Sequence, residues 1–292
     1  MFIATLIAKD RLADGDISAA ADALAEAGLA VVGRSWIEDD RACDLLFSGV
    51  PGDARSALEG LLPRTDVVVQ GESTRRRRLL VADMDSTMIT VECIDELADY
   101  AGVKAEVAAV TERAMKGEIG FEAALAERVA LLAGLEEGAI DRCREERVRL
   151  TPGARTLVRT MKREGAFTLL VSGGFTRFAD PVGAEIGFDR VVANRLDTEG
   201  GRLRGTVIPP VLGAEGKRLA LLAAAAERSL RLDETLAVGD GANDVPMLRQ
   251  AGLGIAYRAK PAAAAAADAC IVHNDLTALL YAQGWPSSRW EQ

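Results

Sequence analysis

The sequence predicts an α/β protein in which a parallel sheet carries a helical insertion and follows a smaller α+β unit. Short apolar runs alternate with helical segments from residue 151 onward. Such alternation implies a parallel sheet with helices on both faces. Residues 91–148 show helical segments only, and residues 1–72 alternate strand and helix patterns in another order. The three observations together favour an α/β core with an insertion and an N-terminal extension.

Composition excludes several classes of function. The net charge of −9 argues against nucleic acid or an anionic membrane as a partner. No stretch approaches the roughly 18 apolar residues of a membrane span, and the N-terminus lacks the pattern of a signal peptide. The four cysteines show no Cys-x-x-Cys spacing, so neither a zinc site nor a disulfide framework is indicated. We therefore expect a soluble, cytoplasmic protein.

The single histidine, His273, lies near the C-terminus. Catalysis by a Ser-His-Asp or Cys-His arrangement would depend entirely on this residue. Both mechanisms are therefore nearly excluded. The chemistry available to the chain is therefore that of carboxylates, lysine, hydroxyl groups and a metal ion.

Residues 1–72 are predicted to form a domain with the order βαββαβ, the ferredoxin-like arrangement. By pattern alone this unit resembles ACT domains, which bind amino acids or mediate dimerisation. The resemblance implies L-serine as a ligand of this domain and a homodimer. The expected strands are Phe2–Ala8, Leu29–Trp36, Cys43–Ser48 and Asp66–Gln70, with helices from Asp16 or Ser18 to Ala27 and over Asp53–Leu62.

Four arginines, Arg75–Arg78, precede the next apolar run. Runs of like charge are usually exposed, so we expect a solvated boundary here, with an anion-binding patch as the alternative. The second domain is then residues 73–292.

A predicted buried strand, Leu79–Ala82, leads directly into Asp83 and Asp85. In an open α/β sheet, ligands bind outside the carboxyl ends of the strands. Residues two apart on an extended segment point the same way, so both carboxylates could face one pocket. Their repulsion would raise one pKa or recruit a hard cation such as Mg²⁺. The alternative is an ordinary turn or helix cap, where Asp is also common.

The helical segment after this strand predicts a four-helix cap over about residues 90–149. Glycines separate the helices, and four short helices without a strand form a small bundle. Inserted just after Asp83 and Asp85, such a bundle would cover the pocket. The expected helices are Glu92–Tyr100, Lys104–Met115, Phe121–Leu132 and Glu136–Arg147.

The α/β pattern then resumes and carries two further polar clusters. The predicted elements are helices from Thr151 to Glu164, over Thr176–Ile186, over Gly216–Ser229 and after Pro261, strands Ala166–Val171, Thr235–Val238, Leu253–Tyr257 and Ala269–Val272, and a hairpin of Arg190–Arg195 with Arg202–Ile208. Ser172-Gly173 follows one strand, and Gly239-Asp240-x-x-Asn243-Asp244 follows another. Lys217 lies between these clusters in the sequence.

In this order and spacing, the clusters resemble the four motifs of the haloacid dehalogenase (HAD) superfamily: Asp-x-Asp-x-Thr/Val, Ser/Thr, Lys/Arg and Gly-Asp-x-x-x-Asp. The resemblance implies a Rossmann-like core. Within the superfamily, Asp83–Ile89, Asp95–Ala98 and Val171–Phe175 are similar to the phosphoserine phosphatases. The similarity spans roughly residues 79–283.

This resemblance implies the catalytic roles. Asp83 would attack phosphorus and become an aspartyl-phosphate. Asp85 would protonate the leaving oxygen and then deprotonate the attacking water. Ser172, the Gly173 N–H and Lys217 would bind the phosphoryl oxygens.

The resemblance also implies Mg²⁺ as the cofactor. Asp83, the main-chain carbonyl of Asp85 and Asp240 would hold the ion, and Asp244 would support them from behind. Asn243 would orient the phosphate or the incoming water.

The substrate that the resemblance implies is O-phospho-L-serine, with L-serine as a product inhibitor. Glu92 would take its ammonium and Arg128 its carboxylate, while Met115 and Phe121 would form an apolar wall. The alternative is that Glu92 and Arg128 are solvated surface residues and that Met115 and Phe121 belong to the core, as such residues more often do. The core motifs also leave open a phosphatase or phosphotransferase for another small phosphomonoester, or a catalytically dead regulatory binding protein.

Overall fold

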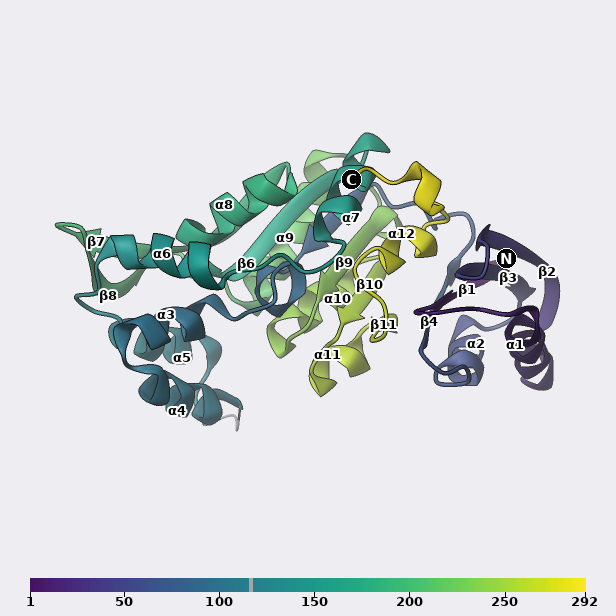
Figure 1. Ribbon diagram of the computed structural model, residues 1–292, viewed down its shortest axis with the longest axis horizontal. Coiled ribbons are helices and arrows are strands. Elements are labelled where there is room, and N and C mark those ends of the chain that lie inside the picture. The colour runs from purple at the N-terminus through teal and green to yellow at the C-terminus, as the bar shows by residue number, and fades with distance from the viewer. Residues whose placement is uncertain (116–117) are drawn as a thin grey trace.

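The computed structural model describes residues 1–115 and 118–292, in which the named strands form two sheets (Figure 1). A small antiparallel sheet has the order β2-β3-β1-β4. A larger, mainly parallel sheet has the order β11-β10-β9-β5-β6-β7-β8. In Figure 1 the larger sheet occupies the centre, with the small sheet on one side and helices α3–α5 on the other. The predicted α/β class is confirmed.

The N-terminal elements follow the predicted order βαββαβ. The second helix begins at Pro51, whose fixed φ suits the first helical position. It ends at Leu58 rather than Leu62, because Glu59 is extended and Gly60 has a φ of +78°. The elements are β1 (Phe2–Ala8), α1 (Asp14–Glu26), β2 (Ala30–Glu38), β3 (Ala42–Ser48), α2 (Pro51–Leu58) and β4 (Thr65–Gly71).

Both faces of strand β4 in the N-terminal sheet are covered. Alternate residues of a strand point to opposite faces, and here they enter two different cores. Val67 and Val69 pack with α1 and α2, whereas Val68 joins the large core that contains Leu279 and Trp285. The small sheet is therefore docked on helix α12 (Ala278–Ala282) and the chain that follows it.

A buried carboxylate fixes this docking. Asp66 on β4 is only 3% exposed, and it accepts hydrogen bonds from the backbone N–H groups of Val272, His273 and Asn274. The side-chain amide of Asn274 adds another bond to Asp66 and one to the carbonyl of Ile7. One carboxylate thus satisfies four donors from the far end of the chain.

We expect Asp66→Ala to lower the free energy of unfolding by about 3 kcal/mol. The change leaves several buried N–H groups without an acceptor, and hydrogen bonds to a charged group contribute roughly 1.5–3 kcal/mol each. Denaturant unfolding measures the effect. Asp10→Ala, which removes a 62% exposed partner of Arg64, serves as the control and should cost less than about 1 kcal/mol. Equal stability of the two variants would contradict this role for Asp66.

The expectation of a solvated boundary at Arg75–Arg78 is wrong for two of the four residues. Arg77 is 3% exposed and donates to the side chain of Gln70 and the carbonyl of Asp233, and burial lowers its pKa to about 10. Arg75 forms a mostly buried ion pair with Asp44 at 2.6 Å. Asp233 and Asp44 lie far away in the sequence from these arginines, so a local charge pattern does not predict their burial.

The larger sheet places β5 (Leu79–Ala82) between β6 (Phe167–Phe175) and β9 (Thr235–Gly239). Strand β6 continues through Ser172-Gly173-Gly174, four residues beyond the prediction, and β7 pairs with β8 as the predicted hairpin. The remaining strands are β7 (Arg190–Glu199), β8 (Arg202–Ile208), β10 (Leu253–Tyr257) and β11 (Ala269–Ile271), and the helices are α7 (Ala154–Arg163), α8 (Thr176–Ile186), α9 (Ala214–Glu227), α10 (Val245–Gln250) and α11 (Pro261–Ala266).

The predicted helical insertion is also present, as α3 (Cys93–Ala101), α4 (Lys104–Met115), α5 (Phe121–Ala130) and α6 (Glu137–Arg147). Its two connections to the core run side by side, since Ile89 and Leu150 form an antiparallel bridge. The loop between α5 and α6 contacts the β7–β8 hairpin, where the Gly134 N–H donates to the Leu203 carbonyl at 2.8 Å. None of the described helices is long and apolar enough to cross a membrane.

Candidate active site

The three polar clusters predicted at strand ends meet at one edge of the larger sheet. Strands β6, β5 and β9 are parallel neighbours, so Ser172, Asp83 and Asp240 leave the sheet at the same edge. The sheet order therefore brings together residues that are up to 157 positions apart in the sequence, as Asp83 and Asp240 are.

The turn after β5 determines where Asp85 points. Residues Met84–Met88 form a single turn in which Asp85 is extended and Ser86 adopts the left-handed region, with a φ of 56°. The Asp85 carboxylate accepts the Cys93 N–H at 3.1 Å, at the start of α3. Its other oxygen lies over Gly174, where a Cβ would be only 2.8 Å away. Gly174 is thus required for the close approach of Asp85 to β6.

Burial and the nearby Glu92 carboxylate raise the pKa of Asp85 to about 6. A carboxyl group with such a pKa exchanges its proton readily near neutral pH, which is the property that a general acid and base needs.

Lys217 binds two carboxylates beneath this edge. Its Nζ lies 2.5 Å from Asp83 Oδ1 and 2.7 Å from Asp244 Oδ1, and all three side chains are almost fully buried. Burial alone would lower the pKa of Lys217, but Asp244 and Asp83 outweigh it and raise that pKa. Burial and Asp244 raise the pKa of Asp83 well above its ordinary value, although Lys217 acts in the opposite direction.

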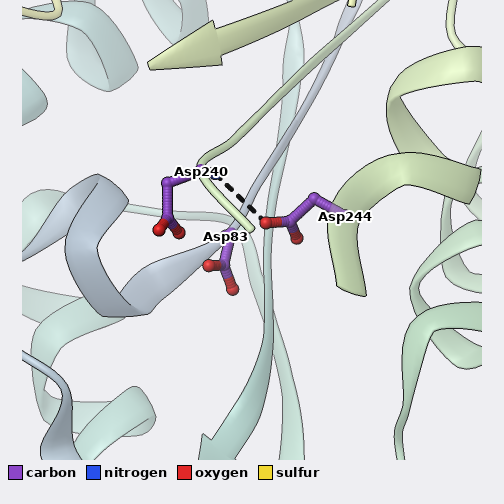
Figure 2. Close-up of side chains that lie close together, drawn as sticks. All are labelled: Asp83, Asp240 and Asp244. Carbon is purple, nitrogen blue, oxygen red and sulfur yellow. Dashed lines mark hydrogen bonds between the residues drawn. The ribbon is translucent and has the colours of Figure 1, made fainter. Parts of the chain in front are cut away.

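Asp244 is held in place on both sides. Its Oδ2 accepts the backbone N–H of Asp240 at 3.1 Å (Figure 2). It also accepts the backbone N–H of Gly241 at 3.0 Å. A Cβ at Gly239 would lie 2.4 Å from the Asp244 Cγ, so this glycine makes the turn possible. Because both oxygens of Asp244 are engaged, it orients Asp240 and Lys217 rather than facing the open side.

Asp83, Asp240 and Asp244 converge closely enough to hold a cation (Figure 2). One oxygen from each lies within 4.8 Å of the others. Burial raises the pKa of Asp240 to about 6, although Lys260 acts against this rise. Buried carboxylates with raised pKa values are negative charges that lack sufficient compensation, and oxygen donors suit a hard divalent ion. The donor set therefore fits Mg²⁺.

A cavity of about 90 Å³, the reaction cavity below, opens beside these carboxylates. It is much smaller than the roughly 300–1,000 Å³ of pockets for drug-sized ligands, so it fits a small molecule. Residues of the cap helices and of the chain that leads into them line the cavity together with residues at the carboxyl ends of the strands. The lining residues are Asp83, Asp85, Glu92, Ile94, Phe121, Leu125, Arg128, Gly173, Gly174, Phe175, Asp240, Asn243 and Lys260.

Most of the predicted site residues therefore lie together. Glu92, Phe121, Arg128, Gly173 and Asn243 line the reaction cavity, as do the catalytic carboxylates. Ser172, Lys217 and Asp244 are fully buried and lie outside its lining. Met115 ends helix α4, and its side chain lies outside the described part of the structure.

Sequence comparison agrees with this geometry. The family of haloacid dehalogenase-like hydrolases matches residues 80–249, which is more than half of the chain. The chain belongs to this family. The HAD motifs expected from the sequence thus correspond to the residues that meet at the sheet edge.

Several relatives of this HAD chain share a name. A phosphoserine phosphatase of Streptomyces coelicolor is 47% identical over 75% of this chain and 53% of its own. The chain spans about half the length of the first curated relatives that it matches. The structure of a probable phosphoserine phosphatase of Vibrio cholerae covers 97% of this chain and 85% of its own, with 32% identity and a TM-score of 0.77.

A further solved structure is described as a phospho-aspartyl intermediate analogue of phosphoserine phosphatase. It is 38% identical to this HAD chain, covers 70% of this chain and 98% of its own, and superposes with a TM-score of 0.66.

Two polar residues of this HAD site were missed by the sequence prediction. Lys260 follows β10, and its Nζ lies 3.4 Å from Asp240 and 3.6 Å from Glu92. Asn194 on β7 bonds the carbonyls of Gly173 and Leu212 and accepts the Leu212 N–H. Lys260 could have been found, because it stands at the carboxyl end of a predicted parallel strand. Asn194 carries no comparable signal.

We expect Lys217→Met to lower the free energy of unfolding by about 3–5 kcal/mol in metal-free buffer. The change removes the common counter-charge of two buried carboxylates, and breaking a buried ion pair typically costs this much. Denaturant unfolding tests it against Lys104→Met, in which the lost ion pair involves a lysine that is 60% exposed. Unchanged stability of Lys217→Met would show that Asp83 and Asp244 do not depend on the ammonium group.

Proposed function

We propose that this chain is a Mg²⁺-dependent phosphoserine phosphatase, which hydrolyses O-phospho-L-serine to L-serine and phosphate through an aspartyl-phosphate on Asp83. The observation that carries the proposal is the composition of the reaction cavity. It combines the Asp83 and Asp85 pair with one further carboxylate, that of Glu92, and one guanidinium group, that of Arg128. The relatives named phosphoserine phosphatase support the same activity.

In the proposed first step, Asp83 attacks phosphorus and the serine oxygen leaves. Asp85 donates its proton to that oxygen, which its pKa of about 6 allows near neutral pH. The negative charge of the phosphoryl oxygens is met by Lys217, the Ser172 hydroxyl and the Gly173 N–H. The bond from serine to phosphorus breaks as the bond from Asp83 forms.

In the second step, water attacks the phosphorus of the aspartyl-phosphate. Asp85, now ionised, takes the proton of that water, and Asn243 orients the water or the phosphate. Asp83 is released as a carboxylate. Each residue therefore returns to its starting protonation state.

The metal site in this proposal consists of Asp83, the main-chain carbonyl of Asp85 and Asp240, with Asp244 behind them. When bound, Mg²⁺ supplies positive charge beside the phosphoryl oxygens. Asp244 keeps Asp240 in place through the Asp240 N–H.

In this proposal, residues of the cap select the substrate. Glu92 would pair with the ammonium of phosphoserine and Arg128 with its carboxylate, while Phe121 and Met115 would form the apolar wall. Burial lowers the pKa of Arg128, and Asp95, Glu92 and Asp85 oppose this effect. An arginine in such surroundings gains from a carboxylate partner, which supports the assignment.

A panel of substrates tests the proposal. We expect the kcat/KM for O-phospho-L-serine to exceed those for O-phosphoethanolamine, glycerol 3-phosphate and O-phosphohomoserine by at least about 30-fold, because only phosphoserine pairs with both Glu92 and Arg128 at the right length. Equal rates across the panel would favour a general phosphatase for small phosphomonoesters. Transfer of phosphate to homoserine in place of hydrolysis would favour a phosphotransferase.

We also propose the division into an ACT-like domain, residues 1–72, and a HAD domain, residues 73–292, with the cap at about 90–149. The first domain is proposed to bind L-serine or to pair two copies of the chain, since β2 is a sheet edge with a single neighbour, β3. Calorimetry with L-serine and analytical ultracentrifugation test these points. The free thiols of all four cysteines support a cytoplasmic location.

A further inference from the structure

Two cavities lie on opposite sides of the Phe121 side chain. One is the reaction cavity of about 90 Å³, and the other, called the outer cavity here, has about 900 Å³. Phe121 lines both of them. The apolar part of the outer cavity comes mainly from strands β7 and β8, from the chain between β8 and α9, and from the first turns of α9. It includes Val192, Ile208, Pro209, Val211 and Leu219.

Two glycines hold the Phe121 ring between these cavities. The ring edge lies 3.3 Å from where a Cβ of Gly173 would be, and Gly173 lines only the reaction cavity. On the other side, the ring lies 3.1 Å from where a Cβ of Gly213 would be, and Gly213 lines only the outer cavity. Both glycines are thus in close contact with the ring, which separates the two spaces.

The outer cavity suits an apolar group. The charged residues of its lining, Glu122, Arg195 and Glu215, are all exposed, so they stand at its rim. Among its apolar lining residues, Val192, Ile208 and Val211 are half-buried, whereas Pro209, Pro210 and Leu219 are exposed. A hydrocarbon chain that entered from the reaction cavity would bury its surface there, whereas a charged group would lose hydration without a buried partner.

We propose that Phe121 sets the upper size limit of the substrate by closing the reaction cavity against the outer cavity. A phosphomonoester whose phosphate lies at Asp83 and whose alkyl chain is longer than two or three carbons would meet the ring. Removal of the ring joins the two cavities and admits an apolar tail. The inference rests on the phosphatase chemistry proposed above, but not on phosphoserine as the natural substrate.

The test compares hydrolysis of ethyl phosphate and n-hexyl phosphate by the full-length protein with Mg²⁺. For the wild type we expect a lower kcat/KM for the hexyl ester than for the ethyl ester. For Phe121→Ala we expect the ratio of hexyl to ethyl to rise by up to about 250-fold, because four more methylenes are buried and each contributes roughly fourfold. Phe121→Leu should give an intermediate ratio.

Two further variants separate the wall from a general loosening of the cap. Leu125→Val enlarges the reaction cavity at a residue that does not line the outer one, so it should leave the ratio within about threefold of the wild type. Leu219→Trp lies only in the outer cavity. As a single variant, Leu219→Trp should not change hydrolysis of ethyl phosphate. Combined with Phe121→Ala, it should remove most of the rise in the ratio of hexyl to ethyl phosphate hydrolysis.

Binding gives a second readout that does not need turnover. Calorimetry with n-hexylphosphonate and Mg²⁺ should show tighter binding to Phe121→Ala than to the wild type, again by up to about 250-fold. A folded Phe121→Ala protein with the wild-type ratio in both measurements would overturn the inference. A wild type that hydrolyses ethyl phosphate but not phosphoserine would contradict the proposed function and leave the role of Phe121 standing.

Discussion

Asp83→Asn is expected to lower the turnover of O-phospho-L-serine by roughly 10⁴–10⁶-fold, the scale of loss seen when a nucleophile is removed from a catalytic unit. The amide has the shape of the carboxylate but lacks its nucleophilic charge. Asp85 cannot replace it, because its carboxylate is held by the Cys93 N–H and lies against Gly174. Release of inorganic phosphate from the purified variant measures the effect.

Two controls accompany this variant. Asp99→Asn makes the same chemical change on the cap, where Asp99 pairs with Lys104 at 3.7 Å, and should stay within about threefold of the wild type. Beryllium trifluoride with Mg²⁺ should bind the wild type as a mimic of the acyl phosphate and should not bind Asp83→Asn. Substantial phosphatase activity in the variant would exclude the covalent mechanism.

Arg128→Ala should reduce kcat/KM for phosphoserine by roughly 30- to 5,000-fold. The change would leave the substrate carboxylate buried without a partner, which costs about 2–5 kcal/mol. O-Phosphoethanolamine is the matched substrate, because it is phosphoserine without the carboxylate. Its hydrolysis should change by less than about fivefold.

Two variants refine the assignment of Arg128. Arg128→Lys should restore little activity, since lysine lacks the planar pair of donors that meets a carboxylate. Arg113→Ala removes another cap arginine, one that pairs with Glu127 and is 44% exposed, and should have little effect on either substrate. Equal small losses on both substrates in Arg128→Ala would show that Arg128 is a solvated helix residue.

The sequence predicts this site well because its residues directly follow short apolar runs, and such runs form buried strands. Buried strands that alternate with helices are expected to lie parallel in one sheet, so the carboxyl ends of the strands before Asp83 and Asp240 share an edge. The spacing of Asp240 and Asp244 likewise fits one turn, and the structure places both there.

The residues that sequence reasoning missed depend on contacts with distant parts of the chain. Arg77 is buried because Gln70 and Asp233 accept its hydrogen bonds, and the four arginines in a row contain no sign of this. Asn194 holds the Gly173 carbonyl only because β7 pairs with β6 in one particular register. Such partners become known only once the topology is known.

The docking of the N-terminal sheet has the same origin. Val67 and Val69 enter one core and Val68 enters the other, but nothing in the local sequence indicates that the second face meets α12. That contact depends on Asp66 reaching the backbone at residues 272–274.

The most direct test of the central claim is the initial rate of phosphate release from O-phospho-L-serine, measured with Mg²⁺ and after dialysis against EDTA. The account predicts rapid release with Mg²⁺, loss of activity in EDTA, and recovery when Mg²⁺ is restored, because the buried carboxylates of Asp83 and Asp240 need a cation beside the phosphate. No release from phosphoserine with Mg²⁺, or full activity in EDTA, would contradict it.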